Sequence, residues 1–476
     1  MGSARDSELS AWTATQIVSA VASGQVSSTE VTAAVLDAVA RLDPSVNAFV
    51  TVDNEGALAR AAELDSLTAR GQSAGPLHGV PVSIKDLSAT RGLRTTMGSR
   101  FFQDWVPEAD DVAPGRLRAA GAVLFGKTNT PHRGHTFFTD NLVCGRTNNP
   151  WAPGRVPGGS SGGAAAAVAA GMGPLAHGTD GAGSIRLPAA LCGVVGFKPS
   201  FGRIPYGPTP QVFGTVRSHV GPLARTVADA ELFLRVTEGA DSRDPLSYSP
   251  GPGPGRSSER RPERPARPLR VGLSPDLGYA AVDPEVRAVV ESAATAFEEA
   301  GMAVDVVELG WPDPTEMQNV LWNATMAMFG AQLISRPEWV EPSLREMVEA
   351  GSAVSMLDYG KAVSYRADYY HLVRKTFSDI DLLVTPTSSV PAWPHDARPA
   401  AVGGHPTATH MHVVPFCFPF NWCGLPAISL PAGLTGEGLP VGLQLVGPWR
   451  ADDLVLSTAA LFERARPWPH RAPLAG

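Results

Sequence analysis

Cysteine is scarce in this chain of 476 residues, and its four copies form no familiar arrangement. There is no Cys-x-x-Cys pair and no group of histidines at the spacing of a zinc site. A disulfide-bonded miniprotein is therefore excluded, and the sequence implies neither a metal ion nor an organic cofactor. We expect reduced thiols, with Cys192 in the core. The four cysteines are Cys144, Cys192, Cys417 and Cys423.

The chain also has no large excess of positive over negative residues or the reverse, and it has no long run of apolar residues. Its 39 basic and 46 acidic residues give a formal net charge of −7, so there is no electrostatic reason to expect nucleic acid or an anionic membrane as a partner. No segment approaches the roughly 18 apolar residues of a membrane-spanning helix, and the first ten residues are polar. We predict a cytoplasmic protein that binds neither nucleic acid nor membrane.

What the chain does contain is ample material for a hydrophobic core, because 43% of its residues are apolar and only 18% are charged. Its 49 glycines and 43 prolines predict many tight turns. Residues 245–268 hold seven prolines and five arginines, so we expect an exposed loop there.

Helix-like and strand-like segments alternate along the chain. A Ser/Thr-rich start and valines four residues apart predict a helix at 27–41. The alternating residues of 79–86 predict a half-buried strand that ends at a lysine. The alternation indicates an α/β fold. Further helices are expected at 164–170 and 284–300, and further strands at 122–125, 269–273 and 441–446.

A phosphate-loop pattern, GxxxxGK[ST], is matched by residues 121–128. The four intervening residues are Ala-Val-Leu-Phe, which are typical of a buried strand and not of a loop whose N–H groups surround a phosphate. We therefore do not predict nucleotide binding.

A second pattern, GxSxG at 158–162, is typical of the serine nucleophile of an α/β-hydrolase. That nucleophile follows a strand, whereas two prolines at 153–157 disfavour one here. A Ser-His-Asp esterase that uses His410 or His412 remains an alternative.

Three segments together are more informative: Lys85 at the end of its strand, the GGSSGG loop at 158–163, and DGAGSIR at 180–186. With them, residues 157–205 and 419–447 resemble the signature and the C-terminal block of the amidase signature family. The resemblance implies one domain over 1–476, with a central twisted mixed β-sheet covered on both faces by α-helices. It also implies a helical substrate-pocket region at about 311–380.

The resemblance assigns a catalytic triad to Lys85, Ser160 and Ser184, with a cis peptide bond before Ser160. A serine hydroxyl is a weak nucleophile until a neighbouring base removes its proton, and a lysine is such a base only when neutral. Burial favours the neutral amine, so we predict that Lys85 acts unprotonated and that Ser160 relays the proton. The resemblance also implies an oxyanion hole made by the backbone N–H groups of Gly181, Ala182, Gly183 and Ser184. We expect Asp180 and Arg186 to be structural.

The chain departs from its relatives at two places. Ala182 stands where a glycine is common, which predicts an altered shape preference. Residues 131–134 read Pro-His-Arg-Gly where Pro-Glu-Phe-Gly is frequent, and in relatives that loop borders the substrate. We therefore predict Gly134, His135 and Trp422 as substrate-binding residues.

These features predict a serine hydrolase that cleaves the C–N bond of small, hydrophobic amides, anilides or carbamates and works as a monomer or homodimer. Residues 413–420 are apolar and offer no carboxylate to bind an ammonium group. Glutamine carries an ammonium group, so this absence disfavours glutamine as the substrate. The glutaminase component of a tRNA-dependent amidotransferase is the alternative within the family.

Overall fold

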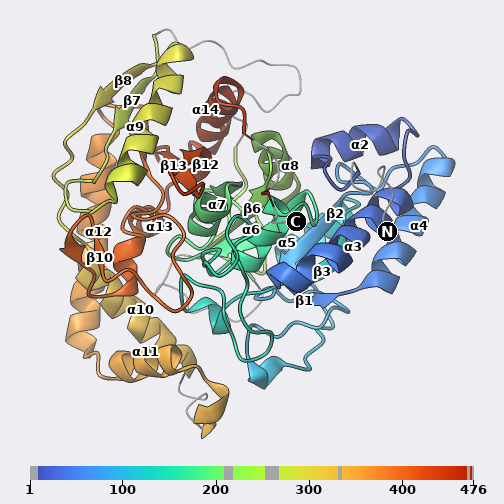
Figure 1. Ribbon diagram of the computed structural model, residues 1–476, viewed down its shortest axis with the longest axis horizontal. Helices are drawn as coiled ribbons and strands as arrows, with labels where there is room; N and C mark the ends of the chain where they lie inside the picture. Colours follow the sequence, from blue (N-terminus) through green and yellow to red (C-terminus); the bar gives the residue numbers. More distant parts are fainter. Residues whose placement is uncertain (1–8, 208–217, 252–266, 331–334, 469–471, 474–476) are drawn as a thin grey trace.

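The computed structural model describes residues 9–207, 218–251, 267–330, 335–468 and 472–473. Figure 1 shows a central sheet with helices packed around it, so the expected α/β architecture is confirmed. None of the described helices is both long enough and apolar enough to cross a bilayer.

The main sheet has eleven strands in the described residues, in the order β1-β3-β2-β4-β6-β5-β12-β13-β9-β7-β8. It is mixed, because β2 is parallel to β3 and β4, and β7 is parallel to β8 and β9, whereas the other neighbours are antiparallel. A separate hairpin is formed by β10 and β11. The strands are β1 Phe49–Val52, β2 Pro81–Lys85, β3 Val123–Thr128, β4 Leu175–Asp180, β5 Val195–Lys198, β6 His219–Ala224, β7 Arg270–Leu273, β8 Ala303–Val306, β9 Leu382–Pro386, β10 Ala401–Val402, β11 His405–Pro406, β12 Ala427–Leu434 and β13 Pro440–Val446.

Helices cover both faces of the sheet. The alternation of β4 makes this clear, because Leu175 packs in the cluster of α5, α8, α9 and α14, whereas Ala176 packs in the cluster of α6 and α7. The helices are α2 Ala14–Ala22, α3 Ser28–Val46, α4 Asn54–Ala69, α5 Val112–Ala119, α6 Gly162–Ala169, α7 Arg186–Cys192, α8 Val227–Thr237, α9 Pro284–Glu299, α10 Thr315–Gly330, α11 Pro342–Ser352, α12 Met356–Thr376, α13 Phe418–Trp422 and α14 Asp452–Ala465. Short 3-10 turns are η1 Arg100–Phe102, η2 His132–Gly134, η4 Pro337–Trp339 and η5 His410–Val413.

The expected helices and strands are all present, with shifted ends. The strand at 79–86 was expected to be half-buried, but β2 is buried along its whole length, because helices cover both faces of the sheet. Helix α3 starts after Ser27, whose side chain and that of Glu30 form a capping box, as the Ser/Thr-rich start predicts. It continues past the expected end, through Pro44 to Val46, because Val46 is buried in a cluster with β1, β3 and α4. Asn47, in the left-handed conformation, ends it.

The rejection of the phosphate loop is confirmed. Gly126, Lys127 and Thr128 belong to the buried strand β3 and form no loop. The Lys127 amine lies in the interior and donates to the hydroxyls of Thr90 (2.8 Å) and Thr95 (3.0 Å), so it is not available to a phosphate.

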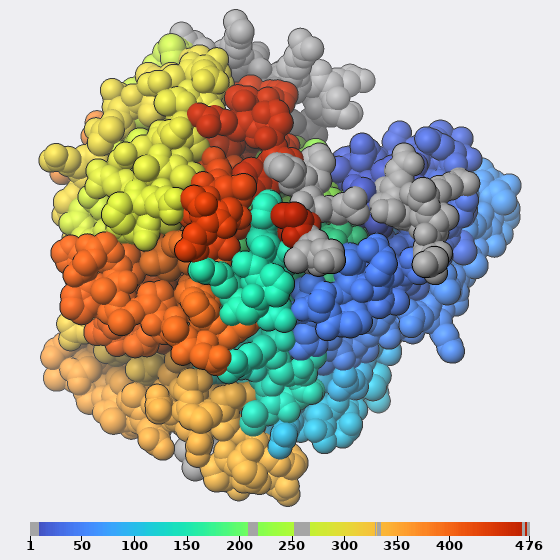
Figure 2. Space-filling model, in the orientation of Figure 1, coloured from blue at the N-terminus to red at the C-terminus, as the bar shows by residue number. Residues whose placement is uncertain are grey.

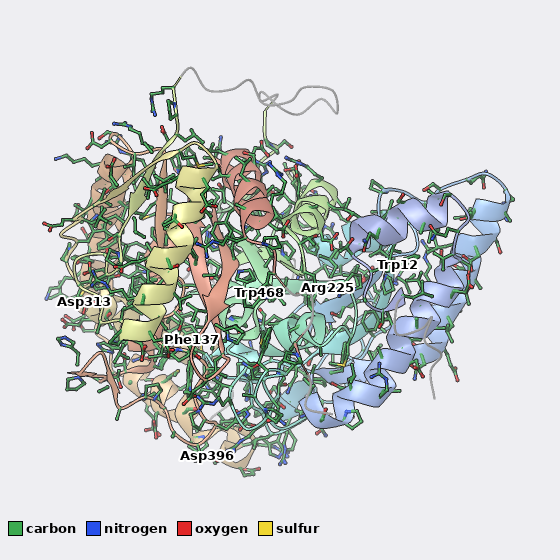
Figure 3. The ribbon with its side chains drawn as sticks, turned by 45° about the horizontal axis from the view of Figure 1, so that its top comes forward. Trp12, Phe137, Arg225, Asp313, Asp396 and Trp468 are labelled. Atoms are coloured by element: carbon green, nitrogen blue, oxygen red, sulfur yellow. The ribbon has the colours of Figure 1, made fainter. Side chains whose placement is uncertain are left out.

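Two further expectations concern segments away from the sheet. Most of the predicted exposed loop at 245–268 lies outside the described residues, which omit 252–266. The region 311–380 is helical: α10, α11 and α12 form the orange part of Figure 1. Its apolar side packs on α13 in a cluster that also contains the buried Phe137, which is labelled in Figure 3.

Candidate active site

Lys85 lies at the carboxyl end of β2, between the parallel strands β3 and β4. Its side chain is completely buried. Four oxygen atoms surround its Nζ atom: Ser160 Oγ at 2.7 Å, Ser161 Oγ at 2.8 Å, Thr179 Oγ1 at 3.0 Å and the Thr179 carbonyl at 3.3 Å. No carboxylate is among these contacts, so the amine is hydrogen-bonded only by uncharged hydroxyl and carbonyl groups.

Burial lowers the pKa of the Lys85 amine well below its ordinary value, and the charge of Asp180 opposes this only in part. The neutral amine has two N–H donors and one lone pair. Because the Ser161 hydroxyl donates to the Thr179 carbonyl (3.2 Å), it can only accept from Lys85. Donation to Ser161 and to either oxygen of Thr179 uses both N–H groups, so the lone pair of Lys85 can accept the hydroxyl proton of Ser160.

The loop before α6 brings Ser160 to the lysine. The peptide bond between Gly159 and Ser160 is cis. Glycine is required at 159, since a Cβ atom there would lie 2.9 Å from the Phe137 carbonyl carbon and from the Phe138 nitrogen. The segment 136–138 thus packs directly against the turn that carries Ser160.

Ser184 lies between β4 and α7, and its carbonyl accepts a hydrogen bond from the Ser161 N–H (3.1 Å). The two predicted serines are therefore on adjoining turns. No hydrogen bond joins the hydroxyls of Ser160 and Ser184, and the Ser184 hydroxyl has no partner within the described part of the chain. Ser184 is 3% exposed.

The predicted oxyanion donors are only partly free. The N–H groups of Gly181, Ala182 and Ser184 have no hydrogen-bond partner among the described residues. The N–H of Gly183 differs from the expectation, because it donates to Asp180 Oδ1 at 2.6 Å. Because the Gly183 N–H is already bonded to this carboxylate, three of the four predicted N–H donors remain available to a substrate oxygen.

Asp180 and Arg186 form a buried ion pair that holds this loop. The Arg186 guanidinium donates to both carboxylate oxygens, at 2.9 and 3.0 Å, and both side chains are 0% exposed. Burial alone would raise the pKa of Asp180, but the guanidinium more than offsets this and holds it below the ordinary range. The structural role expected for both residues agrees with these contacts.

Asn421 and Gln444 extend this network and were not among the predicted residues. Asn421 accepts from Arg186 (2.6 Å) and donates to the Asp180 carbonyl and carboxylate (2.9 Å each), and Gln444 accepts from Arg186 (2.7 Å). Each is a lone polar residue within an apolar segment, which is the signal that can identify such residues.

Gly134 lies beside Ser160. A Cβ atom at this position, where φ is +73°, would be 3.0 Å from Ser160 Oγ and 2.9 Å from Leu87 Cδ1. The next residue, His135, is directed away from the serine: its Nε2 atom contacts Ser343 of α11 (3.0 Å), and its Nδ1 contacts the His132 carbonyl (2.9 Å).

Trp422 lies in the aromatic cluster beneath the helical region. Its indole N–H donates to Gln318 of α10 (2.6 Å), and its ring packs edge-on against Tyr365 and Tyr369 of α12. Its recorded contacts are with α10, α12 and Phe418 of its own helix, not with Lys85 or the serines.

The alternative histidine-based triad finds no support in these contacts. His412 bonds with Thr409 and the His410 ring packs against Phe137, so neither histidine contacts a serine hydroxyl in the described residues. Apart from an isolated bridge at Arg155, residues 153–157 are not in a strand, as their prolines predict. No group of three potential metal ligands occurs in the described part of the chain.

Comparison with known proteins gives consistent results. The sequence profile of the Amidase family matches residues 30–456. An acylamidase of Rhodococcus erythropolis is 40% identical over 467 residues, which cover 97% of this chain and 96% of that protein. A component of the glutamyl-tRNA(Gln) amidotransferase of Moorella thermoacetica is 36% identical, with 95% and 96% covered.

Two solved structures are also similar. A bacterial aryl acylamidase of the amidase signature family superimposes with a TM-score of 0.87 at 32% identity, covering 96% of each chain. A 6-aminohexanoate cyclic dimer hydrolase superimposes with a TM-score of 0.84 at 33% identity, covering 98% and 99%. The family profile, the relatives and the fold all agree, and this chain belongs to the amidase signature family.

Proposed function

We propose that this amidase hydrolyses small amides through an acyl-enzyme on Ser184, with Ser160 as proton relay and Lys85 as base. One observation carries the proposal: a completely buried lysine whose amine lies 2.7 Å from Ser160 Oγ and touches no carboxylate. Such an amine is neutral and basic at the moment when the nucleophile must lose its proton.

In the first step, Ser184 Oγ bonds to the amide carbon while its proton passes to Ser160, and the proton of Ser160 passes to Lys85. The Ser184 hydroxyl is free of other partners among the described residues, and catalytic hydrogen bonds often tighten only when substrate is present. The carbonyl electron pair moves to oxygen, where the N–H groups of Gly181, Ala182 and Ser184 are available donors. Losing one such donor typically costs about 3 kcal/mol of transition-state stabilisation.

The C–N bond then breaks. Ser160 gives its proton to the departing nitrogen and regains one from the Lys85 ammonium group, so the amine leaves neutral. Water then attacks the acyl carbon and gives one proton through Ser160 to Lys85. When the bond between the acyl carbon and Ser184 Oγ breaks, that proton passes back from Lys85 through Ser160 to Ser184, and the carboxylic acid leaves.

Small hydrophobic amides, anilides and carbamates are the substrate class that we propose. Ala182, beside the nucleophile, packs in the apolar cluster of α10, α12 and α13, which contains Phe137 and Phe418. The acylamidase relative and the aryl acylamidase structure support this class. Glutaminase activity within a tRNA-dependent amidotransferase is the second candidate, favoured by the similarity to the amidotransferase component of Moorella thermoacetica.

A fluorophosphonate probe tests the nucleophile. Peptide mapping after labelling should find the probe on Ser184, and Ser184→Ala should abolish both labelling and turnover. Label on Ser160, with activity lost on changing His410 or His412, would support a histidine triad instead.

A substrate panel tests the class. The purified chain should hydrolyse aryl amides or aryl carbamates and leave glutamine intact. Glutamine hydrolysis that appears only with partner subunits would support the amidotransferase. The cytoplasmic location and the monomeric or homodimeric state stay predictions, which fractionation and light scattering can test.

A further inference from the structure

The segment 132–138 lies between Ser160 and a cavity. On one side, Gly134 faces the Ser160 hydroxyl, and the backbone of 136–138 packs against Gly159. On the other side is a cavity of about 370 Å³, whose lining includes Thr136 and Phe138 of this segment and Ser343 of α11. In Figure 2, the turquoise part of the chain, which precedes α6, lies on the surface between the blue and orange parts of the molecule. The segment is therefore the wall that separates the site from this cavity.

Regular secondary structure does not hold this wall. Residues 132–134 form a single 3-10 turn with Arg133 in the left-handed region, φ +51°, followed by Gly134 at φ +73°. The backbone of the turn makes three hydrogen bonds: Gly134 N–H donates to the Pro131 carbonyl, Arg133 N–H to the Met97 carbonyl and His135 N–H to the His132 carbonyl. Side chains on either side of the turn hold it in place.

Those side chains reach the helical region. His132, completely buried, places its Nδ1 atom 2.8 Å from Glu341 Oε2, and the other carboxylate oxygen of Glu341 accepts from the Leu142 N–H (3.2 Å). His135 is held twice, because its ring contacts Ser343 and its carbonyl accepts from Trp322 of α10 (3.1 Å).

The bonding roles at His135 follow from its surroundings. Burial lowers the pKa of His135 to about 4, so the ring is neutral near pH 7. Nδ1 must donate to the His132 carbonyl, which leaves Nε2 to accept the hydroxyl proton of Ser343. Ser343→Ala therefore removes a donor that the ring nitrogen needs.

We propose that Glu341, just before α11, and Ser343, in its first turn, are positioning residues that set the size limit for the leaving amine. The proposal rests on the proposed function, in which Ser160 gives its proton to the departing nitrogen. The group next to Ser160 is then the amine side of the substrate, and the wall at Gly134 limits the space there. When the wall is released, the cavity behind it becomes available to larger amines.

The test compares two substrate series. One keeps the acetyl group and enlarges the amine, from acetamide to acetanilide to N-acetyl-2-naphthylamine. The other keeps aniline and enlarges the acyl group. In Glu341→Ala and Ser343→Ala, kcat/KM for the largest amine relative to the smallest should rise at least about tenfold, the discrimination that one methylene can carry in a pocket. The acyl series should keep its order.

Two variants serve as controls. Glu341→Gln keeps an oxygen acceptor and should stay within about threefold of the wild type. Glu346→Ala removes the same charge one turn further along α11, beside the same cavity, where it has no bond to the segment 132–138. It should leave both series unchanged.

Unchanged amine selectivity in Glu341→Ala and Ser343→Ala, each folded and labelled at Ser184, would overturn the proposal. An equal shift in both series would also overturn it, because general loosening has no preference for the amine side. If Glu341→Ala fails to fold, Ser343→Ala, which loses one hydrogen bond, decides alone. Failure of the wild type to label or turn over would instead refute the proposed function.

Discussion

Replacing Arg186 with methionine tests the physical account of the oxyanion loop. Methionine keeps much of the side-chain volume but leaves the Asp180 carboxylate buried without its cation. Losing one partner of a buried ion pair costs about 3–5 kcal/mol, because the remaining charge is uncompensated. Three further acceptors, on Cys417, Asn421 and Gln444, also lose their donor. We expect the free energy of unfolding to fall by about 3–5 kcal/mol at pH 7, a large part of the total stability of an ordinary protein.

The loss should depend on pH with a definite sign. Arg186 holds the pKa of Asp180 below its ordinary value of 3.8, and we expect burial to raise it above that value when the guanidinium is removed. The folded variant then binds a proton that the unfolded chain does not, so its stability falls as pH rises above about 4. The penalty of the substitution is therefore larger at pH 7 than at pH 5.

Urea unfolding followed by tryptophan fluorescence at both pH values measures these changes. Asp180→Asn in the same background should recover part of the loss, because it removes the unpaired charge. Arg60→Met, which breaks the exposed pair with Glu63, is the control and should cost less than about 1 kcal/mol. A loss below about 1 kcal/mol in Arg186→Met, or a penalty equal at both pH values, would refute the reasoning.

Three further predictions concern the lysine and the wall beside Ser160. Lys85→Met should lower kcat by about 10²- to 10⁴-fold, the usual contribution of a general base, and single-turnover kinetics would show whether acylation is the step lost. In the wild type, kcat/KM should fall as pH drops through the lowered pKa of Lys85, since only the neutral amine accepts a proton, and stability should rise with pH toward 10.5 because the unfolded chain alone keeps that proton. A Lys85→Met variant with the same pH slope of stability would contradict this assignment. Gly134→Ala should cost about 1–2 kcal/mol from its positive φ and disfavour large amines, whereas Gly438→Ala, with a similar φ and open space around it, should leave selectivity unchanged.

Local features of this protein were predictable from the sequence because they depend on neighbours along the chain. The Ser27 cap of α3 follows from hydroxyl and carboxylate side chains three residues apart. The buried strand β3 follows from its run of apolar residues, which also excluded the phosphate loop. The predicted end of α3, at residue 41, was wrong because the burial of Val46 favours another turn, which continues through Pro44.

The positions of Lys85, Ser160 and Ser184 came from ordered motifs, and their roles stay predictions. The resemblance to the amidase signature family identified them, because their three segments match the motifs of that family in order. It did not indicate that the Gly183 N–H is already bonded to Asp180, because that bond depends on how the loop closes.

The sequence by itself thus determined the α/β class, most elements and the residues that carry the proposed chemistry. The tertiary structure alone decided which distant side chains support them. Asn421 reaches Asp180 across 241 residues, and Glu341 reaches His132 across 209. Such pairs depend on the order of strands in the sheet and on the docking of α11. Neither is encoded in local propensity, because burial free energy is gained only when the complete set of surfaces comes together.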